Sequence, residues 1–120
     1  MIDLKTLTEN SIAVRCKTED EAKEFVSRVF KLLPDACRYW QEGVCQWKYY
    51  KENTCYSILG DRDPNNEPTL YYSSDYDYEH DGYQIVNFDE VVFTTQDLGA
   101  LDLSVADLSY LFGLEVATND

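Results

Sequence analysis

The stretch from Thr69 to Phe93 constrains the fold of this chain more than any other. It contains five tyrosines, which alternate with aspartates and glutamates, and it has no lysine or arginine. The tyrosines favour β-strand structure, and so does the apolar run of Ile85, Val86, Phe88, Val91, Val92 and Phe93. Like charges on neighbouring strand positions repel each other, and buried unpaired carboxylates are unfavourable. We therefore expect these acids to face water.

Two geometries fit the acidic half of this stretch. If the chain is extended as far as Glu79, tyrosines occupy one strand face and carboxylates the other, and Asp81-Gly82 forms a hairpin turn. Alternatively, Ser74 to His80 form a helical turn or an irregular loop, and only Tyr83 to Phe88 pair as a strand. Both geometries leave the carboxylates on the surface.

The net charge of −13 is distributed unevenly along the sequence. Residues 1–58 contain nine basic and nine acidic residues, whereas residues 59–120 contain Arg62 against fourteen acids. Such a field repels nucleic acid and anionic membranes and attracts basic surfaces. The charge therefore predicts a basic protein as the partner, with no direct binding to nucleic acid or to membranes.

Length and composition indicate one soluble domain. The chain has 120 residues, of which 44% are hydrophobic and 14% aromatic, which is typical of a globular protein. It has no run of 18 apolar residues, and the N-terminus has neither the basic region nor the apolar core of a signal peptide. We expect a cytoplasmic location.

The elements before Thr69 are indicated by local patterns. Ser11–Cys16 and Thr54–Leu59 predict strands. A capping box at Thr18–Glu21 begins a helix that is expected to extend from Glu19 to Leu33 and to end at Pro34. Its apolar face consists of Ala22, Phe25, Val26, Val29, Phe30 and Leu33. The predicted fold is α+β, with an antiparallel sheet of about four strands packed on one main helix.

The end of the chain predicts a separate acidic extension. Ser104–Asp107 repeats a capping pattern, and a short apolar helix follows that ends at Gly113. We expect residues 1–93 to form the α+β domain and residues 94–120 to pack on it as a C-terminal helical extension.

The cysteines and the single histidine argue against a metal centre and against catalysis. The four cysteines form no C-x-x-C pair and are interpreted as buried thiols, and His80 as a surface residue. Asp61, Asp63 and Asn65 resemble the start of a calcium loop, but Asn66 and Tyr72 replace its glycine and its glutamate. No nucleophile motif or glycine-rich phosphate loop is present. The sequence predicts no metal, no cofactor and no enzyme activity.

The run from Trp47 to Tyr56, followed by Leu70-Tyr71 and by Gly82 to Val91, resembles small, largely uncharacterised proteins of phages and prophages of Gram-positive bacteria. The family pattern of a strand, a T-x-E-E-A-x-x-F helix and a tryptophan-containing strand is matched by Ile12–Cys16, Thr18–Phe25 and Trp47. The resemblance implies a small α+β domain of phage origin and transfers no activity. Two features depart from the family: the tyrosine-rich loop is purely acidic, and the chain continues beyond Phe93.

These observations predict an inhibitor that binds the basic nucleic-acid-binding surface of a host defence protein. Phage anti-CRISPR proteins that occupy the DNA-binding cleft of a CRISPR effector are the model for this class. The candidate contact residues are Asp75, Tyr76, Asp77, Tyr78, Glu79, Asp81, Tyr83, Asp89 and Glu90, flanked by Asp61, Asp63 and Glu67. In the alternative, a protein-binding accessory or a homodimer makes its contact through the apolar C-terminal helix, with Leu108, Leu111 and Phe112.

Overall fold

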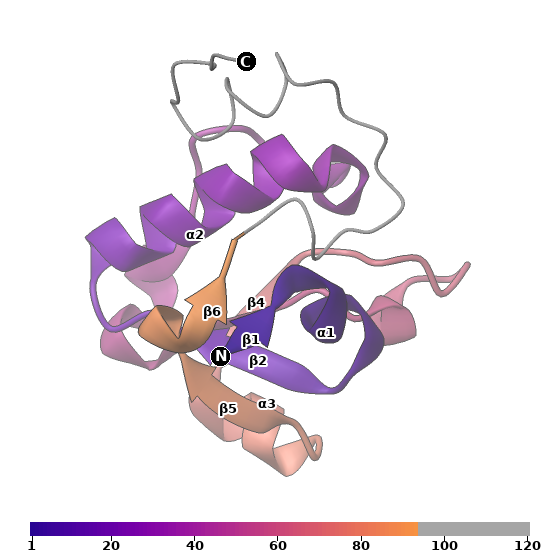
Figure 1. The fold of residues 1–120 in the computed structure, drawn as a ribbon. Helices are drawn as coiled ribbons and strands as arrows, with labels where there is room; N and C mark the ends of the chain where they lie inside the picture. Colours follow the sequence, from indigo (N-terminus) through magenta and orange to yellow (C-terminus); the bar gives the residue numbers. More distant parts are fainter. Residues whose placement is uncertain (94–120) are drawn as a thin grey trace.

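A mixed four-stranded sheet forms the centre of the computed structural model, which describes residues 1–93 (Figure 1). The strand order is β4-β3-β2-β5. β2 and β3 pair antiparallel, as do β3 and β4, whereas β2 and β5 pair parallel. The strands extend over Ile12–Arg15 (β2), Thr54–Ser57 (β3), Tyr71–Ser74 (β4) and Gln84–Asn87 (β5). The predicted α+β class is confirmed.

The prediction of a purely antiparallel sheet is wrong. After β4 the chain does not turn back as a hairpin but forms a short helix, α3 (Asp75–His80), and then re-enters the sheet beside β2 as β5. A parallel pairing needs such a crossover connection. Asp81-Gly82 ends this helix, so the dipeptide that favoured a hairpin terminates α3 instead. The second geometry considered for the acidic stretch, a helical turn followed by a strand, is observed in α3 and β5, but Tyr71–Ser74 also pair, as strand β4.

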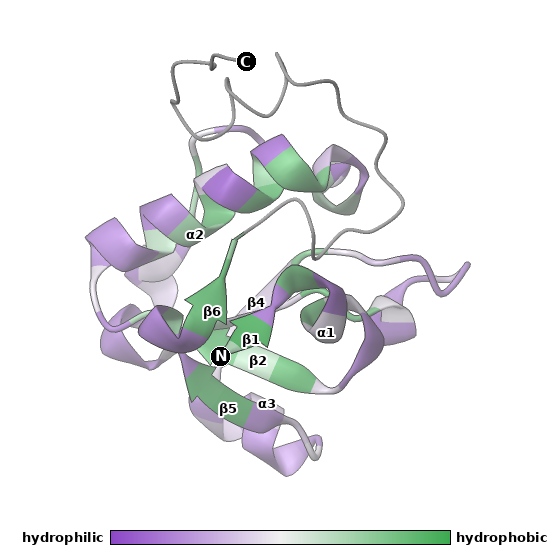
Figure 2. Cartoon of the chain, in the orientation of Figure 1, coloured by the Kyte–Doolittle hydropathy of each residue, from purple (hydrophilic) through white to green (hydrophobic). Residues whose placement is uncertain are grey.

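The helix that the capping box and the apolar spacing predicted is present as α2 (Glu19–Leu32), the main helix of the domain. Thr18 is its N-cap and accepts the backbone N–H of Glu21, at 3.1 Å. The buried side chains of α2 are Ala22, Phe25, Val26, Val29 and Leu32. They pack on one face of the sheet in the larger apolar cluster, together with Val14 and Tyr56. Figure 2 shows α2 divided along its length into hydrophobic and hydrophilic sides.

The N-terminal residues are part of the domain. A two-stranded parallel sheet joins β1 (Ile2–Asp3) to β6 (Val91–Val92). Between β1 and β2 lies α1 (Leu4–Glu9), which buries Leu4 and Leu7 completely. Five 3-10 helices connect the larger elements of residues 1–93: η1 (Pro34–Cys37), η2 (Trp47–Tyr49), η3 (Lys51–Asn53), η4 (Gly60–Arg62) and η5 (Phe88–Glu90).

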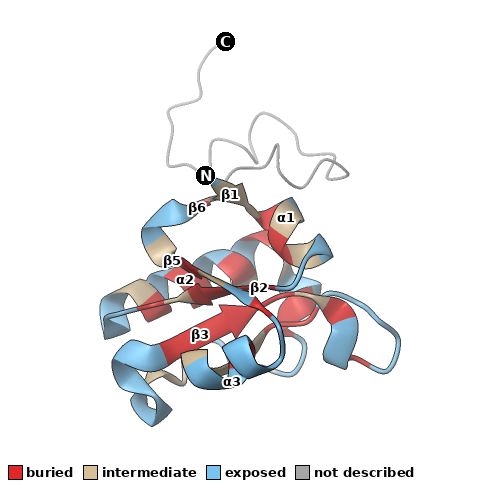
Figure 3. Cartoon of the chain, turned by 90° about the horizontal axis from the view of Figure 1, so that it is seen from below, coloured by how far each residue is buried: buried red, intermediate tan, exposed pale blue. Residues whose placement is uncertain are grey.

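The short helix α3 covers the opposite face of the sheet from α2. Figure 3 shows α3 in front of the buried strand β3, with α2 behind the sheet. A second, smaller cluster of buried side chains fills the space between α3 and the sheet: Ala13, Cys55, Tyr78 and Tyr83. The domain therefore has three layers, and α3 places the acidic stretch on the outside of the third layer.

All four cysteines are buried free thiols, as the sequence predicted. Burial raises the pKa of Cys37 to about 11 and that of Cys55 to about 12. These two thiols are therefore protonated near neutral pH, which makes them poor nucleophiles. The predicted C-terminal helix and the whole extension 94–120 lie outside the described residues.

Candidate functional site

The acidic stretch is shaped into α3 by caps at both ends of the helix. Ser74 is the N-cap and accepts the backbone N–H of Asp77, at 3.1 Å. At the other end the N–H of Tyr83 donates to the carbonyl of Tyr78, at 2.9 Å, and the N–H of Gly82 to that of Glu79, at 3.1 Å. These two bonds form a Schellman motif, which requires positive φ at its C′ residue. Gly82 supplies it, with φ +84°.

Tyr78 anchors α3 to the sheet. Its side chain is completely buried, and its hydroxyl shares a 2.8 Å hydrogen bond with Ser57 Oγ of β3. Its ring lies 4.9 Å from that of Tyr83, which is 6% exposed. Sequence analysis placed both tyrosines on the partner-binding surface, and their burial corrects that expectation. The two rings fill the C-terminal contact of the Schellman motif, so they position the surface without being part of it.

Arg62 ties η4 to this anchor. Its guanidinium lies over the rings of Tyr78 and Tyr83 and pairs with Asp81 at 2.5 Å. The hydroxyl of Tyr83 donates to Asp61 at 2.6 Å. Burial, followed by this bond to Asp61, raises the pKa of Tyr83 to about 12, so the phenol stays protonated and keeps donating at neutral pH.

The nine acids of the predicted site have three kinds of environment. Asp63, Asp75 and Asp81 each pair with an arginine. Asp61, Asp77 and Glu90 accept hydrogen bonds from a neutral hydroxyl or backbone N–H. Glu67, Glu79 and Asp89 are exposed, and their carboxylates make no hydrogen bond or ion pair with any other residue in 1–93. Six of the nine carboxylates therefore have no cationic partner among the described residues.

Asp63, which was predicted as a flanking contact residue, does not face water. It is 5% exposed and pairs with Arg38 at 2.5 Å. Burial on its own would raise the pKa of Asp63, but hydrogen bonds from the backbone of Asn65 and from Arg38 outweigh it and lower that pKa below its usual value. Because Asp63 also accepts the N–H of Glu67, it holds the loop after η4 in place.

The remaining acids fall into separate groups on the surface. Asp75, Asp77, Glu79 and Asp81 lie on or directly after α3, and Asp61 is joined to them through Tyr83 and Arg62. Asp89 and Glu90 lie in η5, after the far end of β5, where Asn87 is in register with Arg15. Glu67 belongs to the loop that Asp63 fixes. The α3 group is therefore the centre of the candidate site.

Tyr76 and His80 form the outward ridge of α3. Tyr76 is 71% exposed, and its ring lies stacked 6.3 Å from the imidazole of His80. With Tyr78 turned toward the sheet, helix geometry places Asp75 and Glu79 on one flank of this ridge and Asp77 and Asp81 on the other. Of the three predicted contact tyrosines, only Tyr76 is available to a partner.

Metal-binding side chains are not clustered in the described part of the chain. Residues 1–93 hold no group of three or more His, Cys, Asp or Glu side chains that could bind a metal ion. The two aspartates of the partial calcium pattern are already engaged, Asp61 with Tyr83 and Asp63 with Arg38. In the same part of the chain, no helix has the length and apolar character needed to cross a membrane.

Sequence reasoning missed three features of the surface. It did not find Arg15, Arg38 and Arg62 as partners of the acids, because each pair joins residues far apart in the chain. It did not find an aromatic surface patch, in which Tyr49 (58% exposed) stacks on the half-buried Tyr72 of the edge strand β4 and the ring of Tyr50 is tilted against it. It also missed a pocket beside α2, although the four-residue spacing of Lys23, Ser27 and Lys31 indicated a continuous polar edge.

Comparison with known proteins identifies no relative. No protein family, no curated protein and no solved structure matches this chain at a significant level. Functional arguments for this chain therefore rest on its own residues and their arrangement.

Proposed function

We propose that this chain is an acidic inhibitor that binds the basic nucleic-acid-binding surface of a host defence protein in the host cytoplasm. A CRISPR effector is the type of target with the required surface. The observation that carries the proposal is the outer side of α3, where the exposed carboxylates of Asp77 and Glu79 flank the exposed ring of Tyr76.

The chemistry of α3 supports phosphate mimicry. Carboxylates spaced by four residues on a helix have Cβ atoms about 5–6 Å apart, so each flank of the ridge presents one carboxylate, Glu79 or Asp77, that has no ion pair within residues 1–93, beside one that is paired with an arginine. Arginines and lysines that bind phosphates also bind carboxylates, and an exposed tyrosine ring can stack as a base does. Binding of this kind is steered by long-range attraction and weakens steeply with salt.

The charge of the rest of the chain adds to the attraction. Residues 94–120 contain five acids and no basic residue, so residues 1–93 carry −8 of the total −13. Acidic residues gained on a phage-type scaffold, together with an added acidic segment, fit recruitment to block a basic host protein.

A capture experiment with charge variants tests this proposal. The tagged full-length chain is incubated with host lysate at low and high salt, beside the double variant Asp77→Asn/Glu79→Gln. These two acids are chosen because neither makes an ion pair with residues 1–93. Neutralising Asp75 or Asp81 as well would remove their ion pairs with Arg15 and Arg62. A loss of capture could then result from lower stability of the domain instead of weaker binding.

The matched control is Glu9→Gln/Asp20→Asn, which removes the same charge from exposed positions on α1 and α2. The proposal predicts that a nucleic-acid-handling protein is retained at low salt, released at high salt, lost with the α3 variant and kept by the control. Equal retention by all proteins at both salt concentrations would contradict phosphate mimicry.

A second candidate function is that of a protein-binding accessory with an aromatic contact surface. The specific observation is the patch of Tyr49, Tyr50 and Tyr72, because tyrosines are enriched among the residues that dominate protein interfaces. The variant Tyr49→Ser/Tyr50→Ser distinguishes the two: it abolishes capture only if this patch makes the contact. The alternative contact through Leu108, Leu111 and Phe112 lies outside the described residues.

A further inference from the structure

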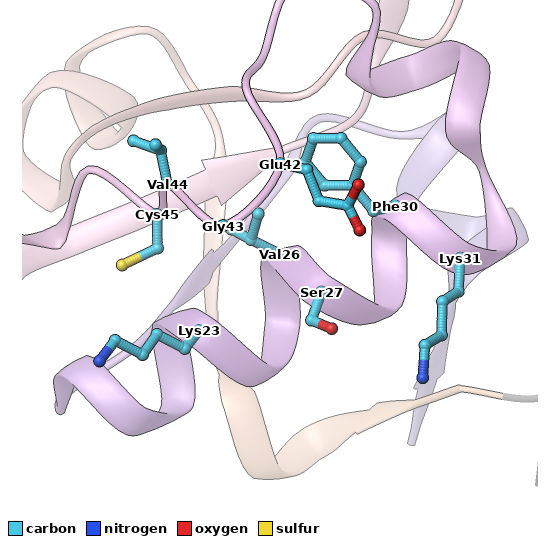
Figure 4. Close-up of a pocket in the computed structure, with 9 residues that line it drawn as sticks. All are labelled: Lys23, Val26, Ser27, Phe30, Lys31, Glu42, Gly43, Val44 and Cys45. Atoms are coloured by element: carbon cyan, nitrogen blue, oxygen red, sulfur yellow. The ribbon is translucent and has the colours of Figure 1, made fainter.

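A pocket lies between α2 and the segment 42–45, on the opposite face of the sheet from α3. Its volume is about 290 Å³, close to the lower end of the range of roughly 300–1,000 Å³ for small-molecule sites. The lining residues come from both walls: Lys23, Val26, Ser27, Phe30, Lys31, Glu42, Gly43, Val44 and Cys45. Figure 4 shows Val26 and Phe30 of α2 turned toward the facing segment, with the side chains of Lys23 and Lys31 extending outward from the helix.

The pocket has an apolar floor and a polar edge. Val26 and Phe30 of α2 oppose Val44 and Cys45 of the facing segment. Lys23, Ser27 and Lys31 follow one edge of α2 at four-residue intervals, so the two lysines are about 12 Å apart along the helix axis.

Both lysines are available to a ligand. They are exposed, and neither makes an ion pair with any residue in 1–93. The pocket therefore combines apolar area for the body of a ligand with an excess of one positive charge among its lining residues, two lysines against Glu42.

The facing wall is held in place by the core. The hydroxyl of Tyr56, a completely buried residue of β3, donates to the carbonyl of Cys45. The N–H of Val44 donates to the carbonyl of Gln41, at 3.2 Å, and Gly43 turns the chain with φ +89°. A Cβ at Gly43 would have no heavy atom within 4 Å, so open space lies beside this turn.

We propose that this pocket binds a small amphipathic acid, with a compact apolar body and one anionic head. The body packs between Phe30 and Val44, and the head lies against the lysine edge. The assignment follows from charge complementarity, since two lysines line the pocket against one carboxylate. It does not rest on the proposed function, because none of the lining residues belongs to α3 or η4.

Glu42 gives the proposal a directional test. Its carboxylate lies beside Phe30, on the opposite wall from the lysine edge (Figure 4). An anionic head placed near Lys23 or Lys31 is attracted by them and repelled by Glu42. Removing the lysine charge must therefore weaken binding, and removing the glutamate charge must strengthen it.

The experiment uses two fluorescent probes that share one ring system. 1-Anilinonaphthalene-8-sulfonate carries an anionic sulfonate, and N-phenyl-1-naphthylamine is the same molecule without it. Each is titrated into the folded full-length chain at low salt, and binding is measured by fluorescence and by calorimetry. We expect saturable one-to-one binding of the sulfonate and at least three-fold weaker binding of the neutral probe.

Variants then assign the site. Lys23→Gln and Lys31→Gln should each weaken sulfonate binding by about two- to five-fold, the range of exposed charge pairs, while Glu42→Gln strengthens it by about two-fold. Ser27→Trp fills the pocket from an exposed helix position and should abolish binding. Lys5→Gln, on α1, removes the same charge away from the pocket and should leave the affinity unchanged.

A chemical readout checks the location without any variant. Cys45 is the one cysteine that lines the pocket, and it is the most exposed of the four at 8%. Iodoacetamide should alkylate Cys45 first, and the sulfonate probe should slow that reaction. Equal affinity for the two probes, indifference to Lys23 and Lys31, or unprotected Cys45 at saturating probe would each overturn the proposal.

Discussion

The anchor of α3 can be tested through one buried hydrogen bond. Tyr78→Phe keeps the ring but removes the hydroxyl, which leaves Ser57 Oγ, 1% exposed, without its partner at 2.8 Å. A buried polar group that loses its partner costs about 1–3 kcal/mol. We therefore expect Tyr78→Phe to lower the free energy of unfolding by that amount, and Ser57→Ala to do so for the same reason.

The double variant gives the sharper result. With both polar groups removed, no unsatisfied atom remains, and only the net value of the bond, about 0.5–1.5 kcal/mol, is lost. The sum of the two single effects, about 2–6 kcal/mol, should therefore exceed the double effect by about 3 kcal/mol at the midpoints of these ranges. The assay is urea unfolding followed by far-UV circular dichroism, with all four proteins of the cycle at the same pH.

Tyr76→Phe is the control on the same helix. Its ring is 71% exposed, so the change should stay within about ±0.5 kcal/mol. Additive single effects, or a Tyr78→Phe variant as stable as the parent chain, would refute the assignment of Tyr78 as the hydrogen-bonded anchor of α3.

Three further predictions concern the same part of the fold. Gly60→Ala should lower the free energy of unfolding by about 1–3 kcal/mol, because a Cβ at this position would lie 2.6 Å from backbone atoms of Asn66 and Glu67. Denaturant unfolding measures this change, and an unchanged midpoint would contradict the close approach of these backbone atoms. Gly82→Ala should lower the free energy of unfolding by about 1–2 kcal/mol because of the positive φ at this position, and Gly82→Asn should lower it less, since asparagine adopts positive φ more readily than alanine. Equal losses of stability in a thermal melting experiment would argue against the Schellman motif. The pKa of Tyr83 is raised from 10.0 to about 12, so the stability that its protonated hydroxyl contributes to the folded state is full below pH 10 and is lost as the pH rises through about 12. The free energy of unfolding, measured across this pH window, should therefore fall less in Tyr83→Phe than in the parent chain. Parallel curves for the two proteins would contradict this prediction.

Local signals made α2 predictable. The Thr18 cap, the apolar spacing and Pro34 all lie within the helix or next to it, and the helix was expected within one residue of its observed end at Leu32. The strand at Ile12–Arg15 was found for the same reason, since its short apolar run is a local signal that needs no distant partner.

The parallel direction of β5 relative to β2 could not be derived from local signals. Asp81-Gly82 suits a hairpin turn, but a glycine with positive φ also suits the end of a helix, and the local sequence does not distinguish the two. The choice depends on Tyr78, whose hydroxyl reaches Ser57 and whose ring packs on Tyr83. Those contacts exist only in the folded sheet.

The candidate site was predictable in its charge but not in its pairing. Most of the acids are exposed, as electrostatics requires. Asp63 is the exception, because Arg38 lies 25 residues earlier in the chain and could not be matched to it from the sequence. Tyr78 and Tyr83 were assigned to the surface because tyrosines can supply stacking area and hydroxyls to a partner, and their packing against Ser57 and against each other exists only in the folded domain.

Competition with nucleic acid tests the central claim most directly. The protein captured by this chain is loaded with a fluorescently labelled oligonucleotide that it binds, and the chain is titrated in at several salt concentrations while anisotropy is recorded. Phosphate mimicry predicts stoichiometric release of the oligonucleotide, weaker release as salt increases, and a marked loss of potency in Asp77→Asn/Glu79→Gln. A ternary complex, in which the chain and the oligonucleotide stay bound together with unchanged affinities, would contradict it.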